Sequence, residues 1–159
     1  MSFDEWILAL HVLSAFAVLA GLILFWALIV AVRRTDTPED TIRMEPIVKV
    51  GNVLIGIGMG GAIVLGIWLA FSYGGYDIWD AWIIAALVLW AVVGVLGQRT
   101  GTAYMQGMTK AQELQAAGQR GPNAELLALN RTSNGVWFHA ATTVVVLLIL
   151  VDMIWKPGA

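Results

Sequence analysis

Four long apolar stretches constrain most strongly what this chain can fold into. They run from Trp6 to Val32, from about Ile47 to Tyr73, from about Ile78 to Gly97, and from Val136 to Trp155. A helix needs about 20 mostly apolar residues to cross a bilayer, because each residue rises about 1.5 Å and the backbone must satisfy its own hydrogen bonds. The sequence therefore predicts an all-α fold, in which residues 1–159 form a single domain built as a four-transmembrane-helix bundle.

The composition agrees with lipid as the main surroundings of the protein. Hydrophobic residues make up 59% of the chain and charged residues 13%, against about 25% charged residues in soluble domains. The net charge of -2 argues against a nucleic-acid partner, which needs an excess of Lys and Arg to neutralise phosphates. The chain has no Cys, which excludes disulfides, thiolate metal sites and iron–sulfur clusters. We expect a lipid bilayer as partner and no nucleic acid.

The basic residues predict the orientation in the membrane, because short cytoplasmic loops retain Lys and Arg. Of nine such residues, eight lie in or beside the first and third connections, and only Lys156 lies on the other face. We therefore predict that both termini lie outside and that the two longer connections are cytoplasmic, in a bacterial inner (cytoplasmic) membrane. The other eight are Arg33, Arg34, Arg43, Lys49, Arg99, Lys110, Arg120 and Arg131.

The cytoplasmic connections contain local helix signals. Thr37 followed by Pro38 is typical of a helix start, and Pro46 is expected to end that short helix before the second span. Residues 110–117 and 123–130 have helical patterns, separated by a break that contains two glycines and a proline. The third and fourth spans are thus predicted to continue into a helical cytoplasmic hairpin.

Small residues form two strips on the second span. Small residues let helices approach closely. The strips therefore indicate tight packing within the bundle, contact with a larger membrane complex or a second copy of the chain, or room for a flat ligand such as a porphyrin. One strip contains Gly51, Gly58, Ala62 and Gly66, and the other contains Gly56 and Gly60.

The two histidines are candidate cofactor and metal ligands. His11 lies about 7 Å inside the outer boundary at about 1.5 Å per residue, and His139 enters the membrane from the cytoplasmic side. A buried imidazole is costly in hydrocarbon unless it is hydrogen-bonded or ligated, so a satisfied structural histidine is the alternative in each case. The two lie near opposite ends of a layer about 30 Å thick, which disfavours joint ligation of one haem.

Asp152 lies near the outer end of the fourth span, at a depth similar to that of His11. A carboxylate at this depth needs a partner, and an imidazole N–H is a suitable one. We predict that His11 and Asp152 form one buried outer-leaflet site, with the other ring nitrogen of His11 free for a cofactor. Asp152 and His139 lie about 140° apart around the helix, so they are not expected to face the same site.

Two short motifs carry a resemblance to known proteins. Leu10-His11-Val12-Leu13-Ser14-Ala15 and the ending from Val151 to Pro157, together with the glycine-rich second span, resemble the predicted integral membrane proteins of unknown function related to copper resistance protein D. A more distant similarity is to the four-helix bacterial protoporphyrinogen oxidase, which implies a haem-linked role for His11. The chain lacks that oxidase's lysine in the third span and its Asn-Glu-Val-Pro sequence.

These observations leave three hypotheses for function. The first is a protein that binds haem b or a related redox cofactor near the outer leaflet around His11. The second is a non-catalytic accessory subunit without a cofactor, which packs against a larger membrane complex. The third is a copper-handling protein. No residue pattern assigns catalytic residues, and the sequence does not decide whether the protein is an enzyme.

The orientation can be tested by labelling single cysteines in intact cells. We expect Gly118→Cys to resist a membrane-impermeant maleimide, because the third connection is cytoplasmic, whereas Gly75→Cys in the second connection reacts. Both variants should react after the membrane is permeabilised. Labelling of Gly118→Cys from outside would contradict the topology.

Overall fold

The computed structural model describes residues 2–72 and 76–157, and all regular secondary structure in these ranges is helical. Four helical segments are long and apolar enough to cross a membrane, which confirms the predicted all-α fold with four spans. Tyr73, the expected end of the second span, lies outside the described residues. The helices are α1 (Phe3–Val32), α2 (Pro38–Ile42), α3 (Glu45–Ser72), α4 (Ala81–Ala116), α5 (Ala124–Asn130) and α6 (Ser133–Trp155).

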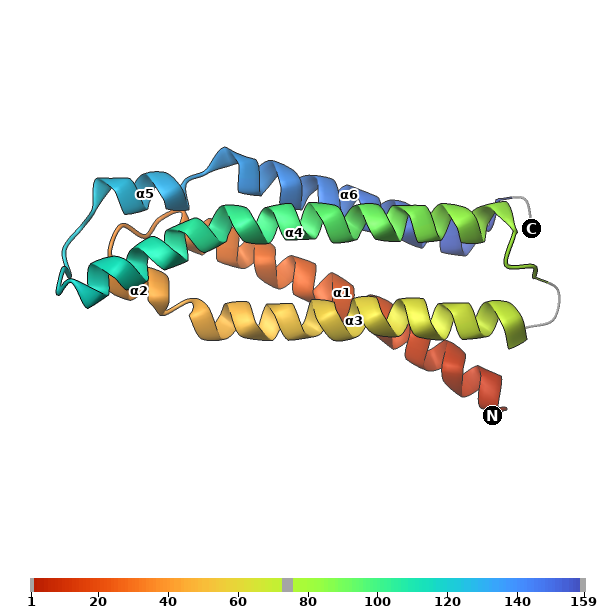
Figure 1. Ribbon diagram of the computed structural model, residues 1–159. Helices are drawn as coiled ribbons and strands as arrows, with labels where there is room; N and C mark the ends of the chain where they lie inside the picture. The colour runs from red at the N-terminus through yellow and green to blue at the C-terminus, as the bar shows by residue number, and fades with distance from the viewer. Residues whose placement is uncertain (1, 73–75, 158–159) are drawn as a thin grey trace.

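The long helices form two pairs rather than a uniformly packed bundle. The helix α1 packs along α3, and α4 packs along α6, whereas α1 and α6 contact each other less extensively (Figure 1). The helices α3 and α4 scarcely contact each other along their lengths. The short helices α2 and α5 pack against the C-terminal part of α4 and cover one end of the molecule. The two pairs can therefore enclose space between them.

The pairing of α1 with α3 depends on the first glycine strip. A Cβ atom built on Gly58 would lie 2.7 Å from the backbone nitrogen of Val18 and 2.8 Å from the carbonyl oxygen of Ser14. A Cβ on Gly66 would similarly lie 2.9 Å from the ring of His11. Only glycine allows the two backbones to come so close. This strip packs within the chain, so it is not available for the partner contact that the sequence left open.

The second strip has a different environment. A Cβ atom on Gly56 or Gly60 would meet no other atom within 4 Å. These two positions face away from α1 and stay open at the surface of the chain.

A small apolar cluster joins the two pairs within the spanning helices. It contains Val18 and Leu22 of α1, Val93 of α4 and Val146 of α6. Trp90, the one tryptophan far from a span end, donates from its indole N–H to the carbonyl oxygen of Met59 on α3 at 3.3 Å. Its polar group thus finds a partner across the gap between α4 and α3.

The first and third connections contain the predicted short helices α2 and α5, whereas residues 110–116 continue α4, and one predicted boundary is corrected. Thr37 caps α2 by accepting a hydrogen bond from the backbone N–H of Asp40 at 3.3 Å. The expectation that Pro46 ends this helix is wrong, because Pro46 lies in the first turn of α3. Proline fits there, since the N–H groups of a first turn have no partner within the helix.

The C-terminal end of α4 shows why the break before α5 contains glycine. Gly118 has a φ of 75°, which lies in the left-handed region that favours glycine. The backbone N–H of Gly118 donates to Gln115, and that of Gln119 donates to Leu114. These bonds satisfy the last carbonyl groups of the helix.

We expect Gly58→Leu to destabilise the protein, whereas Gly60→Leu leaves stability nearly unchanged. The leucine at position 58 must separate α1 from α3, at a cost of about 1–3 kcal/mol or more for overpacking. The leucine at position 60 enters open space. Thermal unfolding in a mild detergent measures both, and equal midpoints would contradict the packing assignment.

Candidate ligand-binding site

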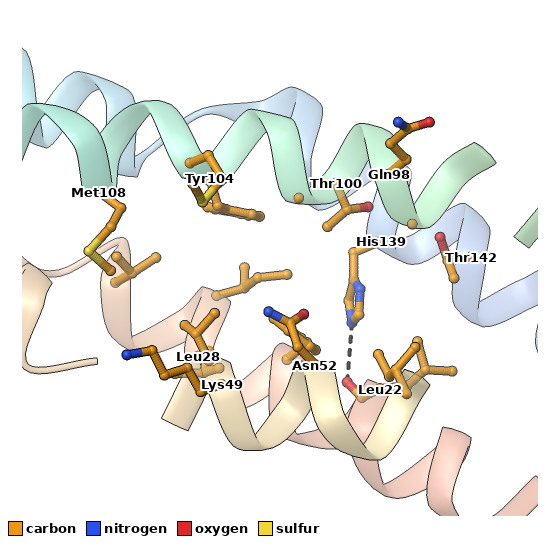
Figure 2. Close-up of a pocket in the computed structure, with 18 of the residues that line it drawn as sticks. Leu22, Leu28, Lys49, Asn52, Gln98, Thr100, Tyr104, Met108, His139 and Thr142 are labelled. Atoms are coloured by element: carbon orange, nitrogen blue, oxygen red, sulfur yellow. Dashed lines mark hydrogen bonds between the residues drawn. The ribbon is translucent and has the colours of Figure 1, made fainter. Parts of the chain in front are cut away.

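A cavity of about 710 Å³ lies between the two helix pairs. All four long helices contribute to its wall, and Figure 2 shows side chains of these helices converging on it. Its volume falls within the range of about 300–1,000 Å³ that is typical of small-molecule sites.

The lining of the cavity changes from apolar to polar along its length. The part near the middle of the helices is lined by residues of the apolar cluster, with Met59 and Trp90. The part near the cytoplasmic connections of our predicted topology carries hydroxyl and amide groups, which belong to Thr41, Asn52, Gln98, Thr100, Gln112 and Asn130.

His139 projects from α6 across this cavity to α1 (Figure 2). It is only 3% exposed, and its Nε2 lies 3.2 Å from the carbonyl oxygen of Leu22. A carbonyl only accepts, so Nε2 carries the hydrogen and Nδ1 keeps a free lone pair. None of the described residues forms a hydrogen bond with Nδ1. The sequence predicted only that His139 lies near the cytoplasmic end of its span, and the structure shows that its side chain is buried between α6 and α1.

Neighbouring side chains fix the orientation of this ring. The indole of Trp26 meets it edge-on, with 4.8 Å between ring centroids. The same indole donates to the hydroxyl of Thr143 at 3.1 Å, and that hydroxyl donates to the carbonyl oxygen of His139. The imidazole is therefore held between α1 and α6 in one tautomer.

Tyr104 is a second polar group of the cavity, which sequence reasoning missed. Its hydroxyl oxygen is buried and has no hydrogen-bond partner among the described residues. The end of its ring lies against Gly135, where a Cβ would be 2.6–3.0 Å from the nearest ring atoms. Gly135 precedes His139 by one turn of α6. A tyrosine near the end of a span carries no sequence signal for this contact, because it depends on packing between α4 and α6.

Three glycines of α4 widen the cavity. Gly94, Gly97 and Gly101 line it, and a Cβ at any of them would meet no atom within 4 Å. The spacing of these glycines is visible in the sequence, but our sequence interpretation assigned possible space for a flat ligand to the second span. In the structure, the open space lies beside these glycines of α4.

His11 and Asp152 do not line this cavity. The ring of His11 faces Gly66 and the backbone of Ala62 on α3, and its Nδ1 is buried without a hydrogen-bond partner among the described residues. Asp152 is also buried, and its Oδ2 lacks such a partner. As expected, Asp152 does not share the site of His139.

The predicted hydrogen bond between His11 and Asp152 is not formed. The helix α1 follows α3, whereas α6 follows α4, and the N-terminal end of α1 and the C-terminal end of α6 lie apart in Figure 1. Similar depth along two helices does not bring their side chains together, because it does not specify their lateral separation.

Hydrogen bonds link the chain segments at the end of the cavity near the first and third connections. Asn130 is 2% exposed, and its amide donates to the carbonyl and hydroxyl oxygens of Thr35 and to the hydroxyl of Thr41 at 3.0–3.2 Å. Arg33 donates to the carbonyl oxygen of Arg131, whose side chain donates back to the carbonyl oxygen of Arg33. These bonds join the first and third connections.

These features define an integral membrane protein with four spanning helices and a partly open cavity between two helix pairs. The chain belongs to the family DUF2269, described as a predicted integral membrane protein, whose model matches residues 5–157. This match confirms that part of the resemblance; nothing supports the further relation to copper resistance protein D or to protoporphyrinogen oxidase. No curated protein and no solved structure matches the chain.

We expect Asn130→Ala to lower the free energy of unfolding by about 2 kcal/mol, since it removes buried hydrogen bonds worth about 0.5–1.5 kcal/mol each. Asn134→Ala is the matched control, because Asn134 is exposed. Chemical unfolding in mild detergent measures both variants. An unchanged stability of Asn130→Ala would show that this end of the molecule does not depend on the Asn130 amide for its stability.

Proposed function

We propose that this protein binds a large, mostly apolar small molecule or prosthetic group in the cavity between its helix pairs. The observation that carries this proposal is the buried imidazole of His139 beside a cavity of about 710 Å³. Protein interiors are normally packed with few voids larger than a water molecule. A cavity of this size with a fixed polar group is the usual form of a ligand site.

The arrangement of the helices provides a route for such a ligand. The helices α3 and α4 both line the cavity but scarcely contact each other. An apolar molecule dissolved in the bilayer can therefore pass between them without crossing water.

A redox cofactor is the occupant class that the sequence suggested, with His11 as its ligand. We transfer the proposed contact to His139, because His11 does not line the cavity. Haem b would be held there through Nδ1, the ring nitrogen not used by Leu22, and would supply electron-transfer chemistry. His11 and Asp152 stay candidates for an outer-end site, since each retains a buried atom without a hydrogen-bond partner among the described residues.

The role of accessory subunit has separate support. The open surface at Gly56 and Gly60 would allow a helix of another chain to approach α3 closely. Copper handling has less support, because the described residues contain no group of three or more His, Asp or Glu side chains that could hold a metal ion. Co-purification of other subunits and metal analysis test these two alternatives.

The main proposal predicts that the protein retains a small molecule when it is purified in a mild detergent. Organic extraction with mass spectrometry identifies an apolar ligand, and a visible absorption spectrum reports haem through its Soret band. We expect Gly97→Phe to reduce the retained ligand at least about tenfold. The phenyl ring fills part of the cavity and should remove more than about 1.4 kcal/mol of binding free energy, which corresponds to a factor of ten.

Gly60→Phe is the matched control, since position 60 has open space but does not line the cavity. It should retain the ligand of the unmodified protein. If the unmodified protein carries no small molecule and takes none up from lipid extracts, the proposed function is wrong.

A further inference from the structure

The cavity presents one fixed acceptor and one unused donor. Nδ1 of His139 has a lone pair, because Nε2 carries the hydrogen that faces Leu22. The hydroxyl of Tyr104 is buried without a hydrogen-bond partner among the described residues. An unpaired buried hydroxyl costs about 1–3 kcal/mol, so a bound group that pairs with it would be favoured.

The two groups come from neighbouring positions along α6. The ring end of Tyr104 lies against Gly135, which precedes His139 by one helical turn. A hydroxyl group can accept from Tyr104 and donate to His139 at once, whereas an ether or carbonyl oxygen can only accept.

The charges around the cavity favour a neutral head group. Glu45 and Lys49 are its charged lining residues in the described part of the chain, and they pair with each other at 2.8 Å. Arg33 does not line the cavity, and its side chain donates to the carbonyl oxygens of Arg131 and Thr132. Among the described lining residues, no cation without an anionic partner is available to a phosphate or carboxylate.

We propose that the cavity binds a neutral amphiphile through one hydroxyl group, which accepts from Tyr104 and donates to His139. Its apolar tail lies along the apolar part of the cavity, towards Val18 and Val93. This inference rests on the proposed function and specifies the ligand class of the same site. The hydroxyl can belong to a phenol or hydroquinone ring or to an aliphatic lipid alcohol.

The test measures equilibrium binding of three probes by the full-length protein in mild detergent. Dodecylphenol and dodecanol carry a ring hydroxyl and an aliphatic hydroxyl, and the methyl ether of dodecylphenol has the same shape but cannot donate. We expect at least one hydroxyl probe to bind, and its affinity to exceed that of the ether or of dodecyl phosphate about tenfold, the factor that corresponds to 1.4 kcal/mol. A preference between the two hydroxyl probes shows whether the bound hydroxyl belongs to an aromatic ring or to an aliphatic alcohol.

Two variants locate the interaction. Tyr104→Phe removes only an unpaired hydroxyl, so it should keep the stability of the unmodified protein and still weaken the binding of the better hydroxyl probe about tenfold. His139→Leu removes both ring nitrogens, including the Nδ1 acceptor, and should abolish the preference for hydroxyl over ether. Tyr76→Phe is the matched control, because Tyr76 bonds Lys156 and does not line the cavity.

The outcomes separate this inference from the proposed function. If hydroxyl and ether probes bind equally, and Gly97→Phe weakens both, the cavity binds ligands but the hydroxyl assignment is wrong. If no probe binds and no small molecule is retained, the proposed function itself fails. A Soret band that depends on His139 would also overturn the hydroxyl assignment, because haem iron would then occupy Nδ1.

Discussion

The close approach of α1 and α3 determines the arrangement of the other spanning helices. At Gly58 and Gly66 the helix α3 has no side chain, and the backbone and side chains of α1 occupy that space. The helix α6 packs along α4 instead, so the two pairs meet through few contacts. The space left between them is the cavity, and its position follows from which helices pair.

The polar groups of the cavity are arranged by contacts between these pairs. His139 reaches from α6 to a carbonyl group of α1, and Tyr104 reaches from α4 to Gly135 of α6. In hydrocarbon such groups are costly when they lack partners. The satisfied Nε2 fixes the imidazole, while Nδ1 and the tyrosine hydroxyl provide the polar contacts that a ligand can use.

The candidate site was only partly predictable. His139 was recognised as a possible ligand because an imidazole in a span is unusual, yet His11 received more weight because it lies deeper from its own end of a span. Depth is a coordinate along the helix and does not specify which neighbour a side chain faces. The sequence does not show which neighbour a side chain faces. For this reason it predicted a pair of His11 and Asp152 that is not formed, and it did not reveal the role of Tyr104.

The sequence by itself determined the four spans, the short helices of the connections and the strip of small residues along α3, because these depend on hydrophobic length, capping residues and local periodicity. It did not determine that Gly51, Gly58 and Gly66 pack against α1, while Gly94, Gly97 and Gly101 line a cavity. Both sets are glycines at helical spacing, and only the position of the neighbouring helices distinguishes them. The tertiary structure alone placed the cavity and selected His139 as its central polar group.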